Sequence, residues 1–86
     1  MGRYSVLLKP SAVKEIESIP LKKERQRVLD RIRRLSEDPR PPGCRKLSDQ
    51  ESYRVRQGRY RIVYTIQDLE LIVEVVRVGD RKEVYR

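Results

Sequence analysis

The chain has 86 residues, of which 21 are lysine or arginine and 13 are aspartate or glutamate, and its formal net charge is +8. A chain of this length supports one small hydrophobic core, so the sequence predicts a single domain over residues 1–86. It contains no histidine and one cysteine, Cys44, which excludes histidine-based catalysis, histidine metal sites and a thiolate zinc cage. We therefore expect no metal or cofactor.

The distribution of apolar residues also argues against a membrane protein. The sequence has no apolar run of bilayer-spanning length and no charged-then-apolar leader, so we expect neither a membrane span nor a secretory signal. A lone cysteine cannot form an internal disulfide, which favours the reducing cytoplasm.

The first half of the chain predicts a strand and two helices. Residues 3–8 alternate in the manner of a strand. A helix follows, for which Ser11 is the expected N-cap and Pro20 the end, because proline cannot continue a helix. A second helix is expected over residues 21–37, and the proline-rich residues 38–43 form a connector.

The second helix has a wide basic face. Its members are Lys22, Lys23, Arg25, Arg27, Arg31, Arg33 and Arg34. Such a face steers a protein towards any polyanion, the ribosome included, and it is equally typical of an ordinary solvated surface. The sequence favours neither interpretation.

After the connector the hydrophobic period changes from 3.6 to 2. Three strands are expected over residues 52–57, 59–66 and 70–78, with tight turns at 57–58 and 67–68. Together with the N-terminal strand they predict an α+β fold. In this fold a four-stranded sheet combines the N-terminal strand with a three-stranded antiparallel meander, and the two-helix hairpin covers one face. Three tyrosines fall on the covered face and are expected in the core: Tyr53, Tyr60 and Tyr64.

Four arginines are predicted to share the other face of the sheet. A turn at residues 57–58 would place Arg54 opposite Arg61 and Arg56 opposite Arg59, and alternation sends all four side chains outward. Like charges at this spacing destabilise a sheet by a fraction of a kcal/mol per pair. A solvated basic surface is one explanation. The clustering favours another, a polyanion ligand, because guanidinium groups bind phosphate oxygens with two parallel hydrogen bonds.

The sequence contains a Tyr-Arg-Val-Arg segment at residues 53–56. Two motifs follow it: Gly-x-Tyr-Arg-x-x-Tyr at residues 58–64 and Val-Gly-x-Arg-x-x-x-Tyr at residues 78–85. In this combination the chain resembles the RelE branch of the RelE/ParE toxin superfamily over nearly its whole length. The resemblance implies a toxin of a type II toxin–antitoxin system that cuts messenger RNA in the ribosomal A site. It also implies metal-free chemistry, in which the substrate's own 2′-hydroxyl attacks the neighbouring phosphate.

The resemblance assigns roles to five positions. It implies that Arg54 and Arg56 are basic residues of the catalytic site, that Arg61 clamps the phosphate, that Arg81 is the leaving-group acid and that Tyr85 stacks on a base. We expect three neighbouring cations to contact RNA: Arg59, Lys82 and Arg86.

The chain departs from the family at two positions. Relatives with lysine at the position of Arg56 have it considered as a general base, but an arginine does not readily release its proton. Many relatives have histidine where this chain has Asp80. That carboxylate would act as a base or, as we favour, as an ion-paired orienter of the neighbouring Arg81. The sequence therefore predicts catalysis by positioning and by electrostatic stabilisation of the phosphorane.

The resemblance also implies partners. These are a cognate antitoxin with an amphipathic, acid-containing helical segment, the ribosome with its messenger RNA, and DNA only indirectly through the antitoxin. Two alternatives stay open. One is a ParE-like toxin that poisons DNA gyrase without cutting nucleic acid, a branch that usually lacks the full arginine and tyrosine set. The other is a non-catalytic basic module that binds RNA or the ribosome.

Overall fold

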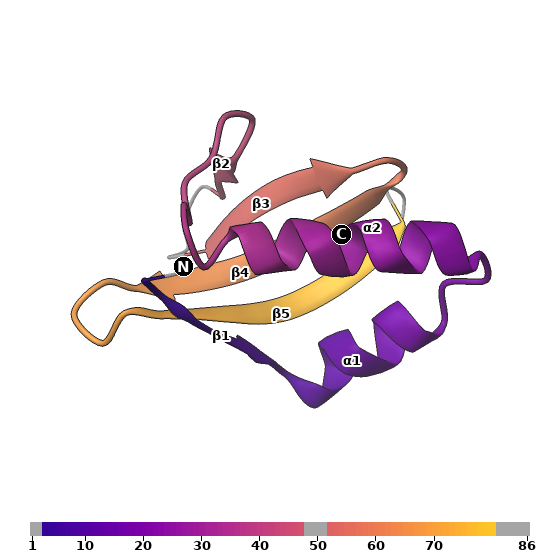
Figure 1. The fold of residues 1–86 in the computed structure, drawn as a ribbon, viewed down its shortest axis with the longest axis horizontal. Coiled ribbons are helices and arrows are strands. Elements are labelled where there is room, and N and C mark those ends of the chain that lie inside the picture. The colour runs from indigo at the N-terminus through magenta and orange to yellow at the C-terminus, as the bar shows by residue number, and fades with distance from the viewer. Residues whose placement is uncertain (1–2, 48–51, 81–86) are drawn as a thin grey trace.

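The computed structural model describes residues 3–47 and 52–80, which form a mixed sheet with two helices on one of its faces (Figure 1). The elements in chain order are β1 (Ser5–Leu8), α1 (Pro10–Glu17), α2 (Lys22–Arg34), β2 (Arg45–Lys46), β3 (Ser52–Gln57), β4 (Tyr60–Gln67) and β5 (Ile72–Asp80). The strand order is β1-β5-β4-β3-β2. β1 pairs parallel with β5, and the other pairs are antiparallel.

The predicted α+β class is confirmed, but the sheet has five strands instead of four. The additional strand, β2, has only two residues, which pair with Arg54 and Tyr53 of β3. Two residues are too few to show the alternation by which a strand is detected in a sequence. The predicted strand at 52–57 matches β3, whereas β4 and β5 begin one and two residues later than predicted.

α1 begins at Pro10 without a side-chain cap. Lys9 occupies the N-cap position, and proline suits the first turn because its φ is fixed and its missing N–H would have no helical partner. Ser11 is therefore not the N-cap that the sequence predicted. Its hydroxyl instead donates a hydrogen bond to the backbone oxygen of Val76 on β5 at 3.2 Å.

α2 ends three residues before the predicted boundary. The amides of residues 35–37 donate to the carbonyls of Ile32, Arg33 and Arg34, each three positions back, so the last turn is tighter than an α-helix. None of the helices in the two described ranges is long and apolar enough to cross a membrane.

The core lies between the helices and the sheet. Its buried apolar residues are Ala12, Ile16, Ile19, Val28, Ile32, Leu35, Val55, Tyr60, Ile62, Tyr64, Val73, Val75 and Val78. Tyr60 and Tyr64 are thus core residues, as predicted, and Tyr53 packs against the same cluster. The helices occupy this face of the sheet and leave the opposite face for other interactions.

Beyond β1, α1 covers the outer edge of β5. The amide of Lys9 donates to the carbonyl of Val75 at 3.0 Å, and Oε1 of Glu15 accepts a hydrogen bond from the amide of Val78 at 2.8 Å. Oε2 of Glu15 also pairs with Arg77 at 3.0 Å. An uncovered strand edge offers unpaired backbone groups to other chains. These contacts satisfy part of that edge and fix the end of β5 against α1.

A network around Asp68 ties the connector to the β4–β5 turn. Arg40 donates two hydrogen bonds to the Asp68 carboxylate, at 3.2 and 2.9 Å, and Tyr4 donates a third at 2.8 Å. The hydrogen bonds from Arg40, and secondly from Tyr4, lower the pKa of Asp68. Nε of Arg40 also donates to the hydroxyl of Tyr53 at 3.3 Å. Segments far apart in the chain are therefore joined at one side of the sheet.

Candidate functional site

Five arginines of the described strands lie on the sheet face that is turned away from the helices, and one of them, Arg77 on β5, is opposite Val63 and pairs with Glu15. Arg56 is directly opposite Arg61 across β3 and β4, and Arg45 is directly opposite Arg54 across β2 and β3. Directly opposed residues project to the same face, and so do residues two apart on one strand. We call Arg45, Arg54, Arg56 and Arg61 the arginine face.

The register of the β3–β4 hairpin differs from the prediction by two positions. The turn is formed by Gly58 and Arg59 instead of residues 57–58. Gly58 has a φ of +61°, a left-handed conformation that glycine adopts without steric penalty and that tight hairpin turns require. As a result Arg56, and not Arg54, faces Arg61. A shift of two positions leaves every side chain that stays in a strand on its predicted face, but Arg59, which was predicted on this face, lies in the turn instead.

The members of the arginine face differ in exposure. Arg61 is 2% exposed and Arg54 is 9% exposed, whereas Arg45 and Arg56 are exposed. Among the described residues, β2 pairs with β3 only at Arg54 and Tyr53 and does not reach the level of Arg56. The predicted open face is therefore only half open. Exposed cations lie beside buried ones.

In the described strands, the residues directly opposite these arginines include no carboxylate. The direct cross-strand pairs are Arg45 with Arg54, Arg54 with Val63, Arg56 with Arg61, and Arg61 with Gly79. Glu74 shares this face of the sheet, but it lies opposite Thr65 at the other end of β4. Gly79 is the residue of β5 that lies opposite Arg61. Because glycine has no side chain, only backbone lies next to Arg61 on that strand.

Arg45 is the member that the sequence did not reveal as a site residue. It follows the connector, where neither helical nor strand periodicity is present. Only its pairing with Arg54 brings it to the arginine face. A possible sequence signal was its position two residues after Gly43, since glycine-containing turns commonly precede a returning strand.

Arg59 has a different environment from the other predicted contacts. It lies in the hairpin turn, and its Nε and Nη2 donate to Oδ2 of Asp80 at 2.8 and 2.6 Å. The hydrogen bond to Asp80 raises the pKa of Arg59. Asp80 is thus ion-paired to Arg59. The predicted partner, Arg81, lies outside the described residues.

Four further candidates also lie outside the described residues. They are Arg81, Lys82, Tyr85 and Arg86. All belong to the segment that follows Asp80, the last residue of β5.

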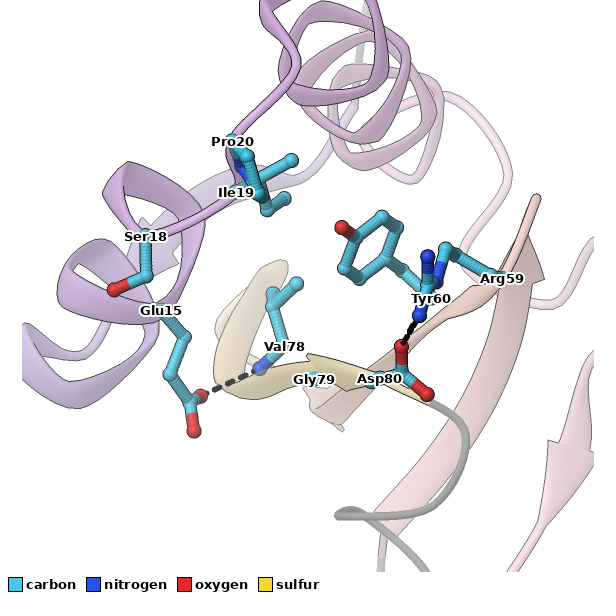
Figure 2. A pocket seen from close by; sticks show the side chains of 9 residues that line it. All are labelled: Glu15, Ser18, Ile19, Pro20, Arg59, Tyr60, Val78, Gly79 and Asp80. Carbon is cyan, nitrogen blue, oxygen red and sulfur yellow. Dashed lines mark hydrogen bonds and ion pairs between the residues drawn. The ribbon is translucent and has the colours of Figure 1, made fainter.

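A cavity of about 450 Å³ lies between the end of α1 and the ends of β4 and β5 (Figure 2). Its lining includes apolar groups of Ile19, Tyr60 and Val78, which belong to the core side of the sheet. The carboxylates of Glu15 and Asp80 at its rim are already hydrogen-bonded, to Val78 and Arg59 respectively. The cavity is therefore on the opposite face of the sheet from the arginine face, and its charged groups are engaged within the protein.

The arginine face is suited to binding and stabilising negative charge. An arginine keeps its proton in proteins and presents five donors in a planar fork. A partly buried guanidinium acts on a phosphate with less screening from water than an exposed one does. The face offers charge stabilisation and orientation of a phosphate ester, and its arginines supply no group that readily accepts a proton.

Comparison with known proteins identifies the family of this chain. The family model for the ParE toxin of the type II toxin–antitoxin system parDE matches residues 6–85. The chain belongs to the RelE/ParE toxin superfamily. An Escherichia coli protein described as a RelE-like toxin is 29% identical to this toxin over 87 aligned positions, which cover 96% of this chain and 90% of the relative.

Solved structures support the same relationship. The toxin matches the archaeal RelE–RelB complex from Pyrococcus horikoshii OT3 with a TM-score of 0.82 at 25% identity, covering 94% of this chain and 98% of the other. It matches the intact E. coli RelBE complex with a TM-score of 0.77 at 25% identity, covering 90% and 95% of the two chains. The fold implied by the sequence motifs is thus the observed fold.

Proposed function

We propose that this toxin is a ribosome-dependent endoribonuclease that cuts messenger RNA in the A site and so inhibits translation. The observation that carries the proposal is the directly opposed pair Arg56 and Arg61, with Arg45 and Arg54 on the same face. Each like-charged pair costs the sheet a fraction of a kcal/mol. An RNA phosphodiester bound across the pair would convert that repulsion into charge-assisted hydrogen bonds.

The proposed reaction needs no metal or cofactor. The 2′-hydroxyl of the substrate attacks the adjacent phosphorus, a new 2′-oxygen–phosphorus bond forms, and the bond to the 5′-oxygen of the next nucleotide breaks. The 2′-hydroxyl loses its proton and the departing 5′-oxygen gains one. Arg56 and Arg61 would stabilise the added negative charge of the phosphorane. From the sequence resemblance, Arg81 would protonate the leaving oxygen and Tyr85 would stack on a base.

The site offers no strong base to remove the proton of the substrate's 2′-hydroxyl among the residues that the structure describes. Arg56 does not readily accept a proton, and an oxygen of the Asp80 carboxylate is already engaged by Arg59. Catalysis would then depend on holding the 2′-hydroxyl in line with the leaving oxygen. We therefore propose slow cleavage of free RNA and faster cleavage of a message that the ribosome presents in the required geometry.

A cognate antitoxin is the proposed protein partner. The toxins of the P. horikoshii and E. coli complexes are both bound to RelB antitoxins. This toxin has a net charge of +8, so an acid-containing antitoxin would associate with it rapidly. We propose that both act in the cytoplasm and that DNA is contacted only through the antitoxin.

The test is to express the toxin under tight control and to map the 5′ ends of translated messages by primer extension. Cuts phased with codons are expected in the wild type and are absent in Arg61→Ala and Arg81→Ala, which also relieve growth arrest. Arg33→Ala is the matched control, because Arg33 is an exposed arginine on α2 that pairs with Asp30. Codon-phased cuts by both site variants would contradict the proposal.

A second candidate is favoured by the description of the matching family model, the ParE toxin of parDE. A toxin of that kind would poison DNA gyrase and would not cut RNA. The same cells distinguish the two, because a gyrase poison produces gyrase-linked DNA breaks and leaves messages intact.

A further inference from the structure

The cations of α2 do not all have the same surroundings. Arg25 donates a hydrogen bond to the backbone oxygen of Ile19 at 3.0 Å, and Arg33 pairs with Asp30 at 3.0 Å. These two cations are engaged within the protein. Four others follow one another along one side of the helix: Lys23, Arg27, Arg31 and Arg34. We call these four residues the basic ridge.

The basic ridge lies on the helix layer of the molecule. Its members are three or four positions apart in the chain, which is the spacing of neighbours on one side of a helix. Lys23, Arg27 and Arg34 are exposed, and Arg31 is half-buried. With a rise of 1.5 Å per residue, the ridge is about 16 Å long. The helices cover the sheet face opposite to the arginine face (Figure 1), so the two basic surfaces belong to different layers.

Helix stability does not account for the first two members of the ridge. Like charges four positions apart destabilise a helix, and Lys23 and Arg27 are such a pair. Lys23 also lies in the first turn, where the helix dipole disfavours a cation, whereas the other two members lie in the last turn, where the dipole favours them. Glu24, the acidic residue of the first turn, accepts a hydrogen bond from the hydroxyl of Tyr60 at 3.4 Å. Among the described residues, none of the four ridge cations takes part in an ion pair.

The surroundings of the ridge suit a nucleic acid better than a protein. Every exposed residue of α2 is polar or charged, whereas the buried centre of a protein interface is depleted of charge. The apolar surface that a protein partner needs lies on the other side of α2, in a groove of about 560 Å³ whose lining includes Val6, Leu8 and Leu29.

The ridge also suits a duplex better than a single strand. α2 contains no aromatic residue, and proteins that bind single strands commonly stack the bases on aromatic side chains. A row of cations without stacking groups contacts the phosphate backbone. Because phosphates of one strand follow each other at about 3.4 Å along a duplex axis, the ridge spans about four or five of them.

We propose that the basic ridge docks the toxin on double-helical ribosomal RNA through the phosphate backbone, while the message lies on the arginine face. The inference rests on the proposed endoribonuclease function, for which it names a second RNA surface. The ridge acts on binding and not on the chemical step, because it lies in a different layer from Arg56 and Arg61. Backbone contacts of this kind carry no sequence preference and weaken as the salt concentration rises.

The experiment uses the full-length toxin and purified ribosomes that hold a defined message with an empty A site. Cosedimentation gives the Kd of the toxin for these ribosomes, and cleavage at increasing ribosome concentrations gives KM and kcat. The ridge variant is Lys23→Gln/Arg27→Gln/Arg34→Gln. The matched control, which also removes three exposed cations, is Arg3→Gln/Lys9→Gln/Lys14→Gln. Thermal midpoints are recorded for every variant.

For docking on duplex RNA, we expect Kd and KM of the ridge variant to rise about tenfold or more at low salt, with kcat unchanged at saturating ribosome concentrations. The slope of log affinity against log salt should fall by about 0.9 for each phosphate contact that is lost. The control should behave nearly as the wild type.

Two single variants at one position keep the test independent of the triple change. Arg27→Gln should lower the salt slope by about 0.9, as expected for one lost contact. Arg27→Lys should keep most of the affinity, because a single phosphate contact needs a positive charge and not the guanidinium fork.

Three results would overturn RNA docking by the ridge. Unchanged ribosome affinity of the ridge variant would do so and would favour an acidic protein as the partner of the ridge. An equal loss of affinity in the control would show that net charge alone explains binding. A lower kcat with an unchanged KM would place the ridge in the chemical step. A wild-type toxin that binds ribosomes through the ridge but cuts no message would instead overturn the proposed function and leave the docking intact.

Discussion

Arg56 and Arg61 lie directly opposite each other on β3 and β4, yet Arg56 is exposed and Arg61 is 2% exposed. The two guanidinium groups therefore differ in hydration while sharing one face. An RNA backbone that reaches Arg56 at the surface would have a second, less hydrated cation beside it. The exposed Arg56 is suited to binding the RNA backbone, and the less hydrated Arg61 is suited to stabilising the negative charge of the phosphorane.

Replacing Arg56 by glutamine is expected to stabilise the toxin. Removal of a like charge directly across from Arg61 should raise the free energy of unfolding by about 0.2–1 kcal/mol. The gain should shrink in high salt, because screening weakens the repulsion in the wild type. Denaturant unfolding at low and high ionic strength measures both effects. Arg34→Gln, on the exposed surface of α2, is the control, and an equal gain there would contradict a cross-strand origin.

Replacing Arg61 by lysine is expected to abolish most RNA cleavage although the charge is kept. A lysine ammonium is a point charge and cannot form the two parallel hydrogen bonds of the guanidinium fork. Loss of one preorganised donor set at a transition state typically costs about 10²- to 10³-fold in kcat. Single-turnover cleavage on ribosomes provides the measurement. Arg45→Lys, at the exposed end of the arginine face, should lose far less, and equal losses would argue against a special role for the buried position.

The Asp68 network predicts a particular dependence of stability on pH. The hydrogen bonds from Arg40 and Tyr4 place the folded-state pKa of Asp68 below its unfolded value, which is about 4. The stabilisation is therefore fully present above the unfolded value and is lost as the pH falls through the folded-state pKa. Asp68→Asn should reduce stability at neutral pH and flatten the loss of stability on acidification.

Urea unfolding at a series of pH values between about 7 and 2 tests this prediction. Glu70→Gln is the matched control, because Glu70 is an exposed carboxylate in the same β4–β5 turn. An acid profile of Asp68→Asn that is parallel to the wild type would show that the network does not act through this carboxylate.

The buried hydroxyl of Tyr64 should contribute to stability but not to catalysis. It donates a hydrogen bond to the backbone oxygen of Pro39 at 2.7 Å, and Tyr64 is fully buried. Tyr64→Phe leaves that oxygen without its donor, which should cost about 1–3 kcal/mol. Tyr53→Phe, whose hydroxyl accepts a bond from the exposed Arg40, should cost less. Thermal unfolding gives the stabilities, and unchanged cleavage per folded molecule is the expected catalytic result.

The faces of the sheet could be predicted from the sequence because side chains alternate with a period of two. That rule placed Tyr60 and Tyr64 in the core and put Arg54, Arg56 and Arg61 on the opposite face. An error of two positions in the register did not change this result, since such a shift preserves the face of every residue that stays in a strand, although it moved Arg59 into the turn.

Features that depend on neighbouring strands could not be predicted in this way. The 2% exposure of Arg61 cannot be read from the alternation of its strand, and the recruitment of Arg45 follows from a strand of only two residues. The pairing of Arg59 with Asp80 joins residues 21 positions apart. No local pattern indicates it, because it depends on where the hairpin turn is centred and where β5 ends.

The parallel pairing of β1 with β5 has a consequence for how the toxin is made. β1 precedes the other strands in the chain, and its partner in the sheet spans residues 72–75. Its pairing must therefore wait until those later residues have been synthesised. Contacts between such distant segments slow folding, because the intervening chain must be closed into a loop before any pairing energy is gained. The addition of β1 to the sheet is thus expected to be a late step in the folding of a newly made toxin.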